Sequence, residues 1–246
     1  MSELFIDIKN AVFGYVHKGA YKEVVRVESL QLSTARFYAL VGNNGSGKST
    51  FLRSISGLQP LLEGSIYIGG ISIDAIEKQK LAEMMAVVLT NRVGGFNLLV
   101  KDAIQSARMP FTNWYHKLAD TDLQAIEVAI NTVDIGGYLN TPLHELSDGM
   151  FQKTMIARAL AQNSTAIALD EPSAYLDYAS KHRLFKLLQQ LSANQLKCIL
   201  ATTHDLDLAL RYSQELLLIE KGSIRPIAVS EAKADAGFRE LSGNFL

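Results

Sequence analysis

The sequence predicts an α/β fold built around a phosphate-binding loop, and three observations lead to this prediction. Short apolar runs recur along the chain and alternate with segments of helical periodicity. One run, residues 37–41, leads directly into Gly42-Asn43-Asn44-Gly45-Ser46-Gly47-Lys48-Ser49-Thr50, which has the form Gly-x-x-x-x-Gly-Lys-[Ser/Thr]. A stretch from about 98 to 162 shows helical patterns without a strand signal. We therefore expect a single domain over residues 1–246, with a helical lobe inserted into the α/β core.

Length and composition agree with one globular domain and narrow the classes of function. The chain has 246 residues, of which 48% are hydrophobic and 20% charged. Its net charge of −1 gives no electrostatic argument for nucleic acid as a partner. A single cysteine, Cys198, excludes an internal disulfide and lies in an apolar run typical of a buried strand.

No membrane or export segment is evident in the sequence. Residues 1–7 lack the basic region and apolar core of a signal peptide. No apolar run approaches the roughly 18–20 residues that span a bilayer. We expect a protein that is soluble, or that is held at a membrane by a partner.

The N-terminal part is predicted to form strands over 4–9 and 24–32, with a loop over 14–19 between them. Tyr15 in this loop is suited to stack on a purine ring. The alternative is a half-buried aromatic side chain at a strand end.

The phosphate loop follows the strand at 37–41 and opens a helix over about 49–56. Gly42, Gly45 and Gly47 let the backbone curl until consecutive N–H groups converge on one anion. The positive end of the helix dipole adds to this. Lys48 supplies a charge for the outer phosphates, and the Ser49 hydroxyl suits Mg²⁺. The loop alone thus predicts a nucleoside triphosphate and leaves its use open.

The middle of the chain is predicted to contain strands at 65–68 and 86–89, followed by mostly helical structure over 100–140. The second strand ends in a loop that begins at Thr90. Trp114 and its aromatic neighbours are interpreted as packing within the helical lobe. Leu146-Ser147-Asp148-Gly149-Met150 then opens a helix that ends near 162, with Ser147 and Asp148 as caps. Its N–H groups could bind an anion, or this could be an ordinary helix start.

Polar residues follow the predicted C-terminal core strands. The run Ala166–Leu169 ends in Asp170 and Glu171, the way in which a phosphate-loop fold presents an acid to Mg²⁺. Glu171 is placed to orient or deprotonate a water. A strand over 197–202 ends near His204, and Asp205 is expected to cap the helix 206–212. Helices are also expected over 178–192 and from about 229, and a strand over 215–219.

With these pieces in order, the chain resembles the nucleotide-binding subunit of an ATP-binding cassette (ABC) transporter over about residues 4–224. The resemblance rests on the phosphate loop, Leu146–Met150, Asp170-Glu171-Pro172, Ala174-Tyr175-Leu176-Asp177 and His204. It implies a phosphate-loop NTPase core of ABC type with an antiparallel β lobe and the inserted helical lobe. It also implies ATP and Mg²⁺ as ligands and ATP hydrolysis as the activity.

The resemblance implies roles for the matching residues. Tyr15 would stack on adenine, Lys48 would hold phosphate, and Glu171 would be the general base for the attacking water. His204 would contact the γ-phosphate, and Asp177 would communicate across a dimer. Ser147 and Gly149 would bind the ATP held by a second copy, so that two subunits enclose two ATP molecules head to tail. The remaining expected ligands are the loop residues Gly42, Asn43, Asn44, Gly45, Ser46, Gly47, Ser49 and Thr50 for phosphate, and Ser49, Asp170 and Thr90 for the metal.

Two positions depart from the family's pattern. The family usually has Gln at Thr90, and three alternatives stay open: Thr90 acts through a water, Asn91 reaches in, or the contact is missing. Asp148 replaces a glycine of the family's Leu-Ser-Gly-Gly-Gln, which either adds charge near the partner's phosphates or caps the helix. Because Lys48, Asp170, Glu171 and His204 are present, we favour an active ATPase over a weakly hydrolytic nucleotide-binding regulator.

Within the family, residues 204–212 and Ala107-Arg108-Met109-Pro110 resemble the importers of iron chelates and cobalamin. The resemblance implies a cargo of ferric siderophore, haem or cobalamin, membrane-embedded permease partners and, indirectly, a substrate-binding protein. It places the subunit in the cytoplasm on the inner face of the cell membrane, with no nucleic-acid partner. The alternative within the family is a soluble ATPase of iron–sulfur assembly.

Overall fold

A computed structural model describes residues 2–17, 19–89, 98–112 and 117–243. It contains one sheet with the strand order β5-β4-β1-β2-β10-β9-β3-β8-β7-β6. The strands are β1 Leu4–His17, β2 Ala20–Ser33, β3 Arg36–Val41, β4 Glu63–Ile68, β5 Ile71–Ser72, β6 Met85–Val88, β7 Ala166–Leu169, β8 Cys198–Thr202, β9 Glu215–Glu220 and β10 Ser223–Ala228. Strands β9, β3, β8, β7 and β6 pair in parallel and form the core, whereas β1, β2, β4 and β5 pair antiparallel.

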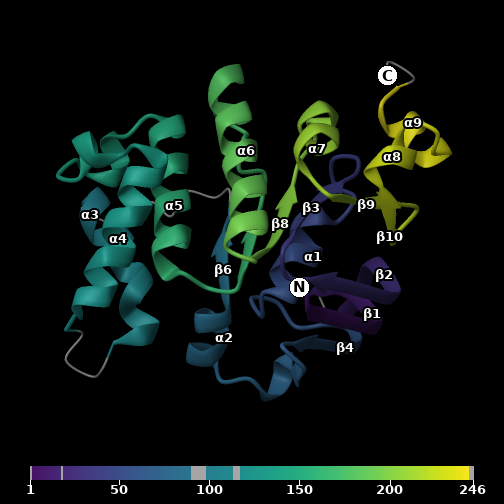
Figure 1. The fold of residues 1–246 in the computed structure, drawn as a ribbon. Helices are drawn as coiled ribbons and strands as arrows, with labels where there is room; N and C mark the ends of the chain where they lie inside the picture. Colours follow the sequence, from purple (N-terminus) through teal and green to yellow (C-terminus); the bar gives the residue numbers. More distant parts are fainter. Residues whose placement is uncertain (1, 18, 90–97, 113–116, 244–246) are drawn as a thin grey trace.

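The α-helices lie in the order α1 Lys48–Ile55, α2 Lys78–Met84, α3 Val100–Gln105, α4 Asp120–Val133, α5 Asp148–Gln162, α6 Tyr178–Asn194, α7 Leu206–Tyr212, α8 Val229–Ala232 and α9 Ala236–Leu241. Short 3₁₀ segments cover Ile73–Ala75, Ser106–Phe111, Gly136–Tyr138 and Leu143–Glu145. Helices α3, α4 and α5 gather at one side of the molecule, as the teal part of Figure 1 shows. Among the described residues, no helix is both long and apolar enough to cross a membrane.

The central strand β3 is buried on both faces, and this explains its continuous apolar sequence. Tyr38 and Leu40 point into the core cluster that contains Phe51 and Leu52 of α1. Phe37 points the other way and packs against Phe185 of α6, with 5.7 Å between the ring centroids. The sheet is therefore covered by α1 on one face and by α6 on the other, which fixes where the loop between β3 and α1 lies.

The helical segments between β6 and β7 have a core of their own. Val100 and Ile104 of α3, Ile126 of α4 and Phe151 of α5 are buried in one cluster. The separate cluster gives a physical reason why the stretch from about 98 to 162 lacks a strand pattern, since its apolar faces are satisfied by helix–helix packing.

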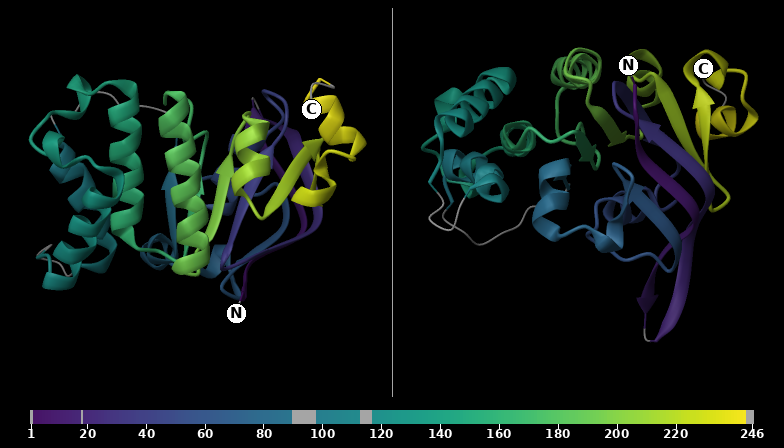
Figure 2. Two further views of the ribbon diagram at one scale, coloured as in Figure 1. Left: turned by 45° about the horizontal axis from the view of Figure 1, so that its top comes forward. Right: turned by 60° about the horizontal axis from the view of Figure 1, so that its bottom comes forward.

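The predicted loop over 14–19 is wrong for most of its length. Strand β1 continues to His17, and Tyr15 pairs with Lys22 of β2 in a long hairpin. The hairpin extends away from the core, as the purple strands in the right panel of Figure 2 show. Pairing with β2 supplies the backbone hydrogen bonds that the sequence pattern did not reveal.

Strand β10 and helix α2 were not predicted, and neither was the two-residue strand β5. Strand β10 pairs antiparallel with β9 along Ser223–Ala228 and contains Pro226. Proline is unfavourable in a central strand, which masks this strand in the sequence. Helix α2 has seven residues and none of them is fully buried. Its Leu81 and Met84 are partly buried against the core, and an apolar face this short gives little periodicity to detect in the sequence.

Candidate nucleotide-binding site

The predicted phosphate loop connects the end of β3 to α1 as a tight turn. Gly45 and Gly47 have φ of 74° and 107°, in the left-handed region that favours glycine. The Ser46 N–H donates to Asn43 O at 3.2 Å, which closes the turn. A Cβ on Gly47 would lie 2.6 Å from Val24 Cγ1 and 2.7 Å from Val25 Cγ2 of β2. Glycine is thus required at 47 by conformation and by the close approach of β2.

Lys48, the first residue of α1, is folded back on its own loop. Its Nζ donates to Gly42 O at 2.8 Å and to Asn43 O at 3.0 Å. The residue is only 6% exposed. Burial lowers the pKa of Lys48, while the negative charges of Glu171 and Asp170 act in the opposite direction. An anion in the loop would offset the cost of burying this charge.

Asp170 lies beneath the loop, directly after β7, and is 4% exposed. Its Oδ1 accepts from Ser49 Oγ at 3.1 Å and from Thr202 Oγ1 at 2.8 Å. Strand β7 lies one strand away from β3, with β8 between them. The predicted metal-binding pair Ser49 and Asp170 is therefore in direct contact, although the two residues are 121 positions apart in sequence.

Glu171 follows Asp170 and has a φ of 44°, which is unusual for a residue with a side chain. Its backbone N–H donates to Thr202 Oγ1 at 2.8 Å. His204, beyond the end of β8, has its Nδ1 3.7 Å from Glu171 Oε2. The two expected catalytic side chains therefore face each other, and about half of the His204 side chain remains exposed.

A pocket of about 440 Å³ opens over this arrangement. Its walls come from the phosphate loop, the start of α1, the β1–β2 hairpin and the strand end after β7. The lining residues are Tyr15, Lys22, Glu23, Val24, Asn44, Gly45, Gly47, Lys48, Ser49, Thr50 and Glu171. A pocket that is lined by polar and apolar side chains and by backbone N–H groups suits a phosphorylated ligand.

Tyr15 lies on this pocket as a partly exposed aromatic side chain, at 41% exposure. Lys22 Nζ lies 5.5 Å from the centroid of the Tyr15 ring, within cation–π range. Lys22 and Glu23 line the pocket but were not predicted from the sequence. The hairpin register pairs Lys22 with Tyr15 and Glu23 with Gly14. This register could have predicted both residues, but it cannot be derived from the sequence unless the turn is located first.

Asn43 and Ser46 line a neighbouring hollow of about 340 Å³, together with residues of β9 and α9. Ser46 Oγ is buried and has no hydrogen-bond partner among the described residues. An unsatisfied hydroxyl in a phosphate loop is available to a ligand.

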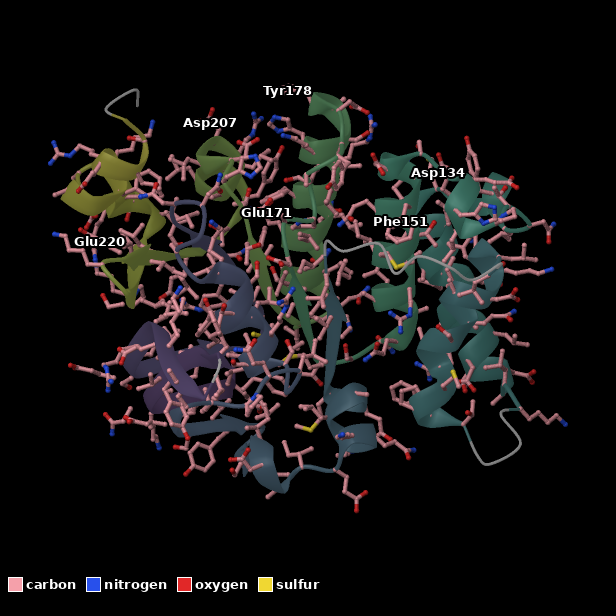
Figure 3. The ribbon with its side chains drawn as sticks, turned by 180° about the vertical axis from the view of Figure 1, so that it is seen from behind. Asp134, Phe151, Glu171, Tyr178, Asp207 and Glu220 are labelled. Atoms are coloured by element: carbon pink, nitrogen blue, oxygen red, sulfur yellow. The ribbon has the colours of Figure 1, made fainter. Side chains whose placement is uncertain are left out.

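Ser147 and Gly149, at the start of α5, do not lie in the pocket over the phosphate loop. Ser147 caps α5, accepting from the Met150 N–H at 3.3 Å, and its side chain is exposed. Neither residue lines the pocket that holds Lys48 and Glu171. Figure 3 shows Glu171 and Phe151, in the first turn of α5, well apart in the view. The capping role expected of this segment belongs to Ser147.

The oxygen donors beside the phosphate loop suit a magnesium ion. Ser49 Oγ and Asp170 Oδ1, two hard oxygen donors, lie 3.1 Å apart at the edge of the phosphate pocket. Mg²⁺ is usually held by one or two protein oxygens together with substrate phosphates and water, and these residues fit that pattern. Within the described part of the chain, no cluster of three or more His, Cys, Asp or Glu side chains could hold a metal ion. Thr90, the third expected ligand, lies outside the described residues, as does Trp114.

Comparison with protein families gives a match to the model described as ABC transporter over residues 25–174. An ABC transporter ATP-binding protein of Methanocaldococcus jannaschii is 35% identical over 82% of this chain and 69% of its own length. The iron(3+)-hydroxamate import ATP-binding protein FhuC of Bacillus subtilis is 32% identical over 83% of this chain and 77% of its own length. The petrobactin import ATP-binding protein FpuC of Bacillus anthracis is 30% identical over 90% and 80%.

Solved structures share the fold. An inward-facing, putative metal-chelate type ABC transporter superimposes with a TM-score of 0.80 at 22% identity, over 98% of this chain and 90% of that one. A dimeric bacterial ABC transporter cassette gives a TM-score of 0.79 at 23% identity, over 91% and 98%. These likenesses confirm the predicted fold class.

Proposed function

The chain belongs to the ABC transporter family and is an ATPase subunit, and we propose that it powers the uptake of a metal chelate through a partner permease. The cargo class is a ferric siderophore, haem or cobalamin. The support for this class is that relatives at 30–32% identity carry the names of import proteins for iron hydroxamate and petrobactin. A cobalamin import ATP-binding protein of Halobacterium salinarum is 31% identical over 75% of this chain, although this match covers 46% of that protein.

One observation carries the proposal of an active hydrolase: Ser49, Asp170 and Glu171 converge beside the phosphate loop. In the proposed site, Tyr15 stacks on the adenine ring of ATP. The residues of the phosphate loop, with Lys48, hold the phosphates. Ser49 and Asp170, and Thr90 as the sequence predicts, would hold Mg²⁺. When bound, that ion neutralises charge on the phosphates.

Glu171 and His204 are proposed to act together at the reacting end of ATP: Glu171 accepts a proton from the attacking water, and His204 contacts the γ-phosphate. The 3.7 Å approach of His204 Nδ1 to Glu171 Oε2 supports the pairing. Phosphoryl transfer needs positioning and charge stabilisation more than a covalent nucleophile. In this proposal Glu171 and His204 position the reacting groups, and Lys48 stabilises charge on the phosphates. Their presence favours an active ATPase over the weakly hydrolytic regulator.

We further propose that two copies enclose two ATP molecules head to tail. Ser147 and Gly149 lie away from the chain's own pocket, and exposure of Ser147 leaves it accessible to a second copy. The N-terminus of α5, a helix of 15 residues, is electrostatically suited to a phosphate. The proposed assembly lies on the cytoplasmic side of the membrane, bound to permease subunits, with a substrate-binding protein as an indirect partner.

Uptake measurements test the transport proposal. We expect cells of the source organism that lack this chain to lose uptake of radiolabelled iron chelate or cobalamin, and wild-type protein but not Glu171→Gln to restore it. The Glu171→Gln exchange keeps the size of the side chain and removes its basicity. Normal uptake of every tested chelate, together with recovery of a soluble iron–sulfur scaffold on co-purification, would overturn the proposal in favour of the alternative.

Two substitutions separate the chain's own pocket from the composite site. Lys48→Ala should weaken ATP binding by the isolated protomer, because the loop loses its only lysine charge. Ser147→Arg should leave that binding unchanged and abolish ATP-dependent dimerisation. ATP affinity by titration calorimetry and mass by light scattering distinguish the two effects. Normal ATP-dependent dimerisation of Ser147→Arg would exclude the composite site.

A further inference from the structure

Thr202 joins the two acids of the site through one buried hydroxyl. It is the last residue of β8 and is 0% exposed. Its Oγ1 donates to Asp170 Oδ1 at 2.8 Å and accepts from the Glu171 N–H at 2.8 Å. We propose that Thr202 is a positioning residue for ATP hydrolysis, which holds the Asp170 carboxylate for the metal and the Glu171 backbone for proton transfer. This inference rests on the roles proposed above for Asp170 and Glu171.

The sheet register brings these groups together. Strand β8 pairs in parallel with β7, with Leu169 opposite Ala201. The next residues along the two strands are Asp170 and Thr202, so their side chains can meet at the end of the sheet. Residues 198–201 of the strand are Cys-Ile-Leu-Ala, all buried. A hydroxyl in such a place costs free energy unless it is hydrogen-bonded, and here both its donor and its acceptor functions are used.

Two hydroxyl groups, of Ser49 and Thr202, donate to Oδ1 of Asp170. They differ in whether a bound ligand requires them to move. Ser49 Oγ lies at the edge of the pocket and is needed for the metal in the proposed function, so its hydrogen bond to Asp170 at 3.1 Å has to adapt to a ligand. Thr202 is enclosed and keeps its contact. The Asp170 backbone is fixed separately, since its N–H donates to Val88 O at 2.8 Å. Thr202 therefore sets the orientation of the carboxylate rather than its location.

The Glu171 backbone also depends on this hydroxyl. Its φ of 44° lies in a region that residues with a side chain rarely adopt. The hydrogen bond from its N–H to Thr202 stabilises that conformation, and the conformation directs the Glu171 side chain toward the pocket and His204. Valine has the shape of threonine and can neither donate nor accept, so it separates this role from packing.

We expect Thr202→Val to lower kcat about 10–100-fold, the range seen when residues behind metal-binding side chains are changed. ATP binding measured in EDTA should stay within about 3-fold of wild type, because the phosphate loop is untouched. Binding of Mn²⁺ in the presence of ADP, followed by electron paramagnetic resonance, should weaken about 10-fold or more. Thr202→Ser keeps the hydroxyl and should retain kcat within about 3-fold, although the lost methyl group lowers its thermal stability.

Controls make the result specific. Thr154→Val is a matched exchange at another fully buried threonine, whose hydroxyl donates to Met150 O within α5, and it should leave Mn²⁺ binding unchanged. If Thr202→Val does not fold, Thr202→Ala is compared with Thr202→Ser, because these two variants differ only by the hydroxyl oxygen. Wild-type kcat and Mn²⁺ affinity in Thr202→Val, or equal activity of the Ala and Ser variants, overturns the inference.

The variant Glu171→Gln distinguishes this outcome from failure of the proposed function. If Glu171→Gln is inactive and Thr202→Val is normal, only the role of Thr202 is wrong. If Glu171→Gln hydrolyses ATP as wild type does, the catalytic site itself is wrongly assigned.

Discussion

Arg108 joins three segments of the helical lobe at one buried point, and its removal is predicted to be severely destabilising. Its Nε and Nη2 lie 2.8 and 2.7 Å from Asp122 Oδ1 of α4. Its Nη1 donates to Ala161 O and Gln162 O at 3.2 and 3.0 Å, which satisfies two carbonyls at the C-terminal end of α5. The other Asp122 oxygen accepts from the Ala119 N–H at 2.9 Å, and this contact, followed by Arg108, holds the pKa of Asp122 below its usual value.

The size of the effect follows from burial. Arg108 and Asp122 are 9% and 5% exposed. Arg108→Ala leaves the Asp122 carboxylate buried without its cation, and breaking a buried pair in this way costs about 3–5 kcal/mol. The two helix carbonyls lose their donor at the same time, and the guanidinium no longer covers the Phe111 ring, whose centroid lies 4.0 Å from its Cζ. We expect a loss of about 3–5 kcal/mol in the free energy of unfolding.

Urea unfolding followed by circular dichroism measures this loss. Arg26→Ala is the matched control, because Arg26 pairs with Glu23 at 2.8 Å while both side chains are about half exposed. Such exposed pairs contribute little, since water and salt screen them. If Arg108→Ala is no more destabilising than Arg26→Ala, the reasoning from burial is refuted.

Three further predictions concern the phosphate loop and residues 197 and 198, where strand β8 begins. Gly45→Ala should cost about 1–2 kcal/mol of stability for its positive φ alone, because no atom lies within 4 Å of the added Cβ. In Gly47→Ala the added Cβ also collides with Val24 and Val25. Calorimetry should therefore show a greater loss of stability and of ATP binding for Gly47→Ala than for Gly45→Ala. Burial lowers the pKa of Lys197 to about 8. The unfolded chain therefore binds more protons between about pH 8 and 10.4, and wild-type stability relative to Lys197→Met should rise over that interval in urea titrations. Burial raises the pKa of Cys198 to about 12, so an aromatic disulfide reagent should react with it only after unfolding; reaction in the native protein at neutral pH contradicts its burial.

The phosphate loop was predictable because its chemistry is local. One short segment contains the glycines at 42, 45 and 47 and the lysine at 48. Neighbouring residues in this segment determine its conformation. The capping roles of Ser147 and Asp205 were predictable for the same reason, since a cap and its N–H partner lie within one turn. The acids after β7 were predicted from the apolar run that precedes them.

The features that the sequence did not reveal depend on strand pairing. Strand β10 with Pro226 was missed because its hydrogen bonds come from pairing with β9 and, at Ser223, with β2. Tyr15 was expected in a loop, although the hairpin extends β1 through it and places Lys22 beside its ring. Thr202 was unremarkable in sequence, because a threonine at a strand end has many possible partners.

The sequence by itself determined the chemical parts: a loop shaped for phosphates, two acids after a buried strand and a histidine after another. Periodicity and turn residues act over a few positions, so each part could be recognised without its neighbours. The tertiary structure alone decided which atoms meet, because contacts such as Ser49 with Asp170 and Thr202 with both acids join residues that the order of the strands in the sheet brings together. Loop closure and sheet register are long-range properties, and they turn these separate parts into one site.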